Sequence, residues 1–136
     1  MGKRKILFLC TGNSCRSQMA EGFALDMGWD AYSAGTKPEI EVNPFAINVM
    51  AEIGIDIAQH KPETISKYLD KNFDIIATLC DNAHETCPIF TGFSKHQIHN
   101  GFIDPADADG SDGEITEVYR QVRDEIRDWV TKISEV

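Results

Sequence analysis

The sequence predicts an α/β fold, in which one domain over residues 1–136 contains a four-stranded, mostly parallel sheet flanked by helices on both faces. Short apolar runs alternate along the chain with segments of helical periodicity, the order expected for parallel strands joined by helices. The run 73–79 is apolar almost throughout, which is typical of a strand buried on both faces. A length of 136 residues fits one domain, and no internal repeat or linker interrupts it.

The first half of the chain predicts two strands and three helices. Asn43 and Pro44 form a clear helix start, because asparagine caps helix N-termini and proline suits the first turn. Gly28 and Gly54 each follow a helical pattern and indicate where it ends. The expected elements are a strand at 6–9, a helix from about Ser17 to Met27, a strand at 29–34, a helix at 43–53 and a helix at 62–70.

The second half predicts two further strands and a long helix. The strands are expected at 73–79 and, more weakly, at 97–98. Ser111 and Glu114 have the spacing of a capping box, which indicates the start of the last helix. Its apolar stripe predicts a core face made of Ile115, Val118, Tyr119, Val122, Ile126, Trp129, Val130 and Ile133.

Charge and segment lengths exclude several partners. The net charge of −9 argues against binding to nucleic acid or to an anionic membrane surface. The apolar run after the basic N-terminus is too short for a signal peptide or a membrane span. We therefore expect a cytoplasmic monomer in which cysteines are reduced unless they take part in redox chemistry.

The segment 10–17, CTGNSCRS, has the pattern of an anion-binding loop between a strand and a helix. The helix N-terminus and Arg16 favour the thiolate form of Cys10, so we expect Cys10 to be a nucleophile placed beneath a bound oxyanion. The alternative is a buried structural cysteine, and Cys15 is expected to be a packing residue. The residues expected to bind the oxyanion are Thr11, Gly12, Asn13, Ser14, Cys15 and Arg16.

A second pair of cysteines follows the strand at 73–79. If this strand is parallel to the first, Cys80 emerges at the same sheet edge as Cys10. In a helix, Cys80 and Cys87 would be ~10 Å apart, too far for a disulfide, so closing that bond predicts a local conformational switch. The alternatives are two unrelated buried cysteines or a zinc site including His84, although the spacing does not match zinc knuckles. Beyond this pair, Asp104 before Pro105 could supply a proton to a leaving oxygen.

Taken together, these motifs resemble those of the thioredoxin-coupled arsenate reductases, which share the fold of low-molecular-weight protein tyrosine phosphatases. The matching segments are residues 10–22, 32–35, 42–44, 78–80, 87–88 and 104–106. The resemblance implies a function in arsenic detoxification, with arsenate as the substrate, phosphate or sulfate as mimic anions and thioredoxin as the reductant.

The resemblance also implies roles for individual residues. Cys10 would attack arsenate, with Asp104 as proton donor and Ser17 hydrogen-bonded to the Cys10 sulfur. Cys80 and then Cys87 would carry the oxidation as a disulfide cascade, with no bound organic cofactor. Some members of the family bind potassium, and the matching positions here are Asn13, Glu21, Ser33 and Glu63.

Two other functions compete with this interpretation. A low-molecular-weight tyrosine phosphatase needs only Cys10, Arg16 and Asp104, but residues 106–109 are ADAD and offer no aromatic wall for a phosphotyrosine ring. Even a reductase is expected to show weak phosphatase activity, because phosphate and arsenate share shape and charge. A non-enzymatic thiol sensor is the second competitor.

Overall fold

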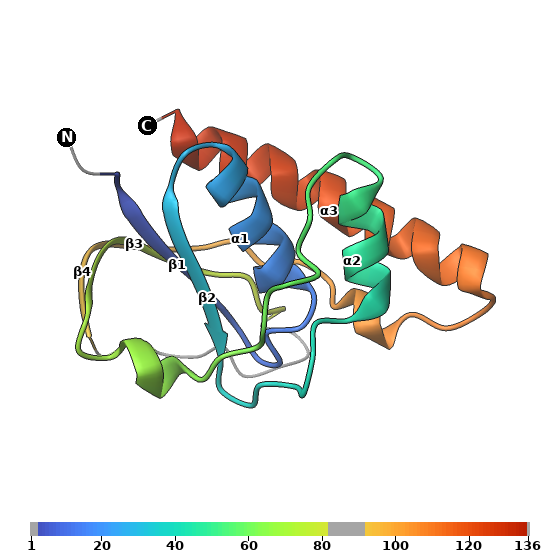
Figure 1. Ribbon diagram of the computed structural model, residues 1–136, viewed down its shortest axis with the longest axis horizontal. Helices are drawn as coiled ribbons and strands as arrows, with labels where there is room; N and C mark the ends of the chain where they lie inside the picture. The colour runs from blue at the N-terminus through green and yellow to red at the C-terminus, as the bar shows by residue number, and fades with distance from the viewer. Residues whose placement is uncertain (1–2, 82–91, 136) are drawn as a thin grey trace.

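The computed structural model describes residues 3–81 and 92–135, which form one four-stranded sheet covered on both faces. The strands are β1 (Lys5–Cys10), β2 (Asp30–Gly35), β3 (Asn72–Thr78) and β4 (Phe93–His99), in the order β2-β1-β3-β4. All three neighbouring pairs are parallel, so the predicted fold class is confirmed (Figure 1). The carboxyl ends of β1 and β3 meet at one edge of the sheet, since Leu9 lies opposite Thr78.

The two faces of the sheet are covered differently. Three α-helices pack on the face that carries Ile6 and Phe8, namely α1 (Arg16–Asp26), α2 (Pro44–Ala51) and α3 (Asp112–Ser134) (Figure 1). The opposite face, with Leu7 and Leu9, packs against the short 3₁₀ helix η1 (Ile65–Tyr68). A second 3₁₀ helix, η2 (Pro105–Asp107), precedes α3.

The helix starts follow the capping signals in the sequence. Asn43 accepts a hydrogen bond from the Phe45 amide at 2.9 Å, and Ser111 and Glu114 form the reciprocal capping box of α3. Of the stripe predicted on α3, Ile115, Val118 and Trp129 are only partly buried, whereas the other five members are buried. None of the helices in the described ranges is both long and apolar enough to span a membrane.

The helix predicted at 62–70 is wrong except for one turn, the 3₁₀ helix η1. The preceding backbone is extended because it hydrogen-bonds elsewhere: the Glu63 amide donates to Asn13 Oδ1 at 2.8 Å, and its carbonyl accepts from the Gly35 amide. These tertiary contacts use groups that a helix would need. Leu69, within the predicted helix, is 40% exposed.

Strand β4 is longer than the two residues predicted at 97–98. It spans seven residues and pairs with β3 along this length, from Asn72–Phe93 to Thr78–His99. Its position at the edge of the sheet explains the weak signal: most of its side chains are exposed and polar, so the apolar alternation of a half-buried strand is absent.

Candidate active site

The loop after β1 forms the wall of a cavity of about 230 Å³ at the carboxyl end of the sheet. Cys10 ends β1 and is 2% exposed, and α1 begins at Arg16. Among the described residues no side chain caps the N-terminus of α1, so its first amides can bind other acceptors. The cavity is lined by residues 10–16 together with Lys37, Glu39, Asp104 and Ala106.

The orientation of the loop amides follows from the partners of the loop carbonyls. Three loop carbonyls accept hydrogen bonds from backbone amides of the segment after β2. Lys37 N donates to Thr11 O at 2.9 Å, Glu39 N to Gly12 O at 2.9 Å and Asn43 N to Ser14 O at 3.0 Å. In a trans peptide the next N–H points opposite to the carbonyl. The amides of residues 12, 13 and 15 are therefore turned away from these outer partners, as an anion-binding loop requires.

Two positions make this tight loop possible. Asn13 adopts a left-handed conformation with φ 51°, which asparagine tolerates better than most residues. Gly35 lies against the loop so closely that a Cβ there would overlap Thr11 O and lie 3.1 Å from Asn13 N. A glycine at the end of β2 is therefore needed for the loop to approach the sheet.

A buried hydrogen-bond chain orients the Ser17 hydroxyl toward the Cys10 sulfur. Asn13 Oδ1 accepts from Glu63 N at 2.8 Å and from Gln18 Nε2 at 3.2 Å, so its Nδ2 donates to Ser17 Oγ at 2.7 Å. Ser17 Oγ lies 2.9 Å from Cys10 Sγ and keeps its own proton to donate to the sulfur. The Ser17 hydroxyl is therefore in place to contact the sulfur during a nucleophilic attack.

Arg16 and Asp104 meet across the cavity. Arg16 is 2% exposed; its Nη1 donates to Phe102 O at 3.1 Å, and its Nη2 lies 3.5 Å from Asp104 Oδ2. The other Asp104 oxygen, Oδ1, accepts from the Ala106 amide at 3.0 Å in the first turn of η2. The guanidinium is thus fixed at the cavity wall beside a carboxyl group that is about one-third exposed, at 31%.

Cys15 has the environment of a packing residue. Its thiol is 3.5 Å from the Tyr119 hydroxyl, and the Tyr119 ring stacks on Phe45. Burial raises the pKa of the Cys15 thiol to about 11, so this thiol is neutral at physiological pH. The prediction that Cys15 packs rather than reacts is supported by this geometry.

Cys80 lies just beyond β3 and is completely buried. Cys10 and Cys15 are free thiols, whereas Cys80 is disulfide-bonded. Its backbone lies next to the segment after β4, because a Cβ on Gly101 would lie 3.3 Å from Cys80 O. Cys87 and His84 lie outside the described residues, so the predicted switch over 80–88 stays a prediction.

The residues expected to bind potassium are partly assembled. Ser33 Oγ donates to Glu21 Oε1, and burial, with the Glu63 charge adding to it, raises the pKa of Glu21 to about 7. Oxygen donors of this kind suit a hard cation, but Asn13 Oδ1 already accepts two hydrogen bonds and Glu63 pairs with Lys67 at 3.1 Å. Within residues 3–81 and 92–135, no three His, Cys, Asp or Glu side chains form a metal-binding group.

Several residues that organise this site were not singled out by the sequence. Gln18 is completely buried; it donates to Asn13 O at 3.1 Å, and its Oε1 lies 3.1 Å from His60 Nδ1. Lys37 and Glu39 line the cavity mouth. The helical period gave no signal for Gln18, because it places Gln18 on the side of α1 opposite the apolar positions 19, 20, 23, 24 and 27.

Comparison with known proteins agrees with this geometry. Residues 5–136 match the model of the low molecular weight phosphotyrosine protein phosphatase family. The chain is 50% identical over 129 residues to the arsenate reductase of Halalkalibacterium halodurans, covering 93% of this chain and 91% of that one.

Solved structures give the same result. An arsenate reductase in the oxidised state superposes with a TM-score of 0.81 at 29% identity, and one in the phosphate-binding state with a TM-score of 0.77 at 30% identity. Each comparison covers 97% of both chains. The chain therefore belongs to the low molecular weight phosphotyrosine protein phosphatase family, together with these arsenate reductases.

Proposed function

We propose that this protein reduces arsenate to arsenite, using Cys10 as the nucleophile and Cys80 and Cys87 to carry the oxidation away. The observation that carries the proposal is the loop itself: three amides turned away from the segment 37–43, the Arg16 guanidinium and the Cys10 sulfur, 2.9 Å from the Ser17 hydroxyl, lie around one cavity. The 50% identity to an arsenate reductase over nearly the whole chain supports arsenate as the tetrahedral oxyanion.

In the first step, arsenate binds between the loop amides of Thr11 to Arg16 and the Arg16 fork, and the Cys10 thiolate attacks arsenic. An As–S bond forms and one oxygen leaves as water, protonated by Asp104 at the opposite wall of the cavity. Ser17 stabilises the thiolate before the attack, since its hydroxyl lies 2.9 Å from the sulfur.

In the second step, Cys80 Sγ attacks Cys10 Sγ. The As–S bond breaks and its electron pair stays on arsenic, which is thereby reduced from As(V) to As(III) and leaves as arsenite. Cys87 then attacks Cys80, and the resulting disulfide is reduced by an external dithiol, for which we propose thioredoxin. The disulfide-bonded Cys80 in this structure is compatible with the oxidised end of the cycle.

A potassium ion bound by Asn13, Glu21, Ser33 and Glu63 is a further part of the proposal. The ion would place positive charge beside the Glu21 carboxyl group and stabilise its ionised form, which burial otherwise disfavours by raising the Glu21 pKa. Potassium chloride should then raise the melting temperature more than choline chloride at the same ionic strength. An equal response to both salts would contradict specific potassium binding.

The test of the function is NADPH consumption in a coupled assay with arsenate, thioredoxin and thioredoxin reductase. The intact protein is compared with Cys10→Ser, Cys80→Ser and Cys87→Ser, and each substitution should abolish arsenate-dependent turnover. A Cys15→Ser variant is the matched control because Cys15 is a buried free thiol with no step in the cascade.

The second candidate function is a phosphotyrosine phosphatase, which the family model favours. Apart from the loop, the described residues that line the cavity are Lys37, Glu39, Asp104 and Ala106, and none of these has an aromatic side chain to hold a phosphotyrosine ring. Phosphatase turnover that needs Cys10 but survives Cys80→Ser, with no arsenate reduction, would establish this alternative instead.

A further inference from the structure

Gln18 is a buried polar side chain to which the mechanism above gives no task. It lies in the first turn of α1 and is completely buried. Its side-chain nitrogen Nε2 lies 3.1 Å from Asn13 O, 3.2 Å from Asn13 Oδ1 and 3.3 Å from Lys61 O. Because an unpaired buried polar group is costly, these contacts hold Gln18 and the backbone around it in one arrangement.

The orientation of the Gln18 amide follows from one unambiguous donor. The Glu63 backbone N–H donates to Asn13 Oδ1 at 2.8 Å, so this atom is the oxygen of the Asn13 side chain. Gln18 must therefore present its NH₂ group to Asn13, and its own oxygen Oε1 lies 3.1 Å from His60 Nδ1. His60 Nδ1 consequently carries a proton and donates it to Gln18. Both ends of the Gln18 amide are thus fixed, one by Asn13 and the other by His60.

The partner of the Asn13 carbonyl sets the direction of the next amide. Of the four carbonyls of residues 11–14, three accept hydrogen bonds from the backbone of the segment 37–43, and the fourth, Asn13 O, accepts from Gln18. The peptide bonds of the loop are trans, so the Ser14 N–H points opposite to Asn13 O and away from Gln18. Ser14 lines the cavity, and Gln18 is not among the residues that line it.

We propose that Gln18 is a positioning residue that turns the Ser14 amide toward the bound oxyanion, an inference that deepens the proposed function and rests on it for the substrate. The segment 37–43 orients the amides of residues 12, 13 and 15, and Gln18 orients the fourth donor from the opposite side of the loop. Gln18 also holds Asn13 in its left-handed conformation, with φ 51°, which most residues adopt rarely. It acts through the backbone, as a support of the anion-binding groups.

The first test measures how strongly inorganic phosphate protects Cys10 of the reduced protein from iodoacetamide, which gives a dissociation constant without arsenate turnover. Gln18→Met keeps the length of the side chain but has no N–H for Asn13 O, so the Ser14 amide is no longer fixed. We expect the phosphate dissociation constant to rise ~10-fold, as for the loss of one hydrogen bond to a charged group. Gln121→Met is the matched control, because Gln121 is an exposed glutamine on α3.

A second measurement distinguishes the positioning of one amide from general damage to the loop. In ¹H–¹⁵N spectra of the intact protein, phosphate should shift the Ser14 amide proton downfield together with the amides of residues 12, 13 and 15, since hydrogen bonding to an anion deshields the proton. In Gln18→Met, the Ser14 amide should shift clearly less, whereas the other three amides should keep their shifts because the segment 37–43 still orients them.

The intact protein also tests the coupling if Gln18→Met fails to fold. Binding of phosphate to the oriented Ser14 amide should stabilise the hydrogen bond between Gln18 and Asn13 in return, so phosphate should slow the exchange of the Gln18 Nε2 protons with water.

Three results would overturn this inference alone: an unchanged phosphate dissociation constant in Gln18→Met, an equal loss of all four amide shifts in that variant, or exchange of the Gln18 Nε2 protons that does not respond to phosphate. If all four amides respond as expected but the intact protein forms no arsenite from arsenate, the proposed function is overturned and the positioning role of Gln18 is supported.

Discussion

The carboxyl ends of β1 and of β3–β4 lie at the same edge of one sheet, yet they are built in opposite ways. The loop after β1 is partly to fully buried, and its carbonyls and the Asn13 side chain have several partners from the chain segments around it. Strand β4, in contrast, is an edge strand whose side chains are mostly exposed. Binding a tetrahedral anion requires preorganised groups, whereas exchange with an external dithiol requires access.

Arg16→Lys should produce the largest effect, because it changes the preorganised side of this comparison. A lysine cannot contact Phe102 O and two anion oxygens at once, as the guanidinium fork can. We expect arsenate-dependent kcat/KM to fall ~10³-fold, in the range measured when a transition-state donor is removed. Lys95→Met on β4 is the control, and similar losses in both variants would contradict the comparison.

The same substitution at two glycines tests the difference in packing directly. An alanine at Gly35 would overlap Thr11 O, so we expect Gly35→Ala to cost about 3 kcal/mol of unfolding free energy. Gly101→Ala meets Cys80 O at 3.3 Å at an exposed corner and should cost less than about 1 kcal/mol. Urea denaturation measures both, and equal costs would show that the two ends are packed alike.

The buried Cys15 thiol should become reactive only at high pH. Burial raises the pKa of Cys15 from 9.0 to about 11, which lowers its thiolate fraction at pH 8 by about 10². Alkylation of Cys15 should therefore be negligible near neutral pH and rise about tenfold per pH unit up to pH 11. Mass spectrometry of iodoacetamide-treated protein measures this, with the guanidinium-unfolded chain as reference. Rapid labelling of native Cys15 at pH 7 would contradict its role as a packing residue.

How much the sequence could predict differs between the same two regions. The strand-to-helix turn at 10–17 was predicted correctly because its signals are local: an apolar strand, a glycine and the start of a helical pattern follow one another within a few residues. The groups that hold the loop were not predicted: the Glu63 amide and the Phe102 carbonyl contact it across long sequence distances, and Gln18 lies opposite the predicted apolar stripe of α1. The helix predicted at 62–70 failed for the same reason, since the backbone of Glu63 hydrogen-bonds to the loop and to β2.

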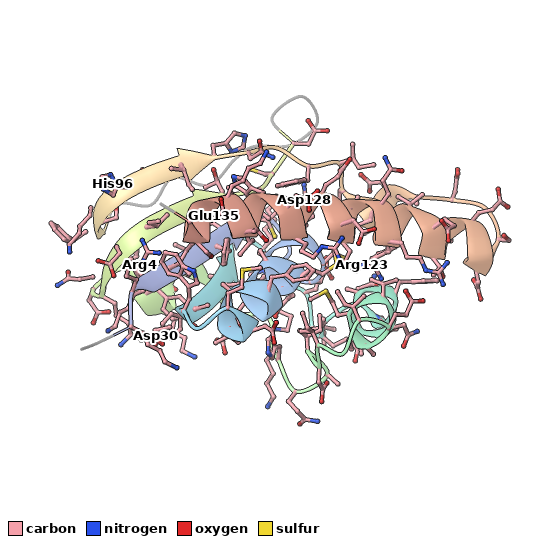
Figure 2. All side chains as sticks on the ribbon, turned by 90° about the horizontal axis from the view of Figure 1, so that it is seen from above. Arg4, Asp30, His96, Arg123, Asp128 and Glu135 are labelled. Carbon is pink, nitrogen blue, oxygen red and sulfur yellow. The ribbon has the colours of Figure 1, made fainter. Side chains whose placement is uncertain are left out.

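Away from the site, α3 and α2 are joined by a buried arginine, a contact that the helical pattern alone does not predict. Arg123 on α3 points toward α2 (Figure 2), where its Nη1 donates to Val49 O at 2.9 Å and lies 2.9 Å from Glu52 Oε1. Arg123 is 8% exposed, and its guanidinium caps the last turn of α2. A charged residue at this position of α3 is therefore part of the core packing of the helical layer.

The smallest effect is expected on β4, at its first residue. Phe93 is 60% exposed although it is aromatic, so its ring contributes little buried area. We expect Phe93→Ser to change the unfolding free energy by no more than about 0.5 kcal/mol, the usual range for surface substitutions, and to leave arsenate turnover unchanged. Urea denaturation and the coupled assay measure the two quantities. A loss above about 2 kcal/mol would mean that Phe93 packs against another part of the chain, and the edge strand would then be a supported element like the loop after β1.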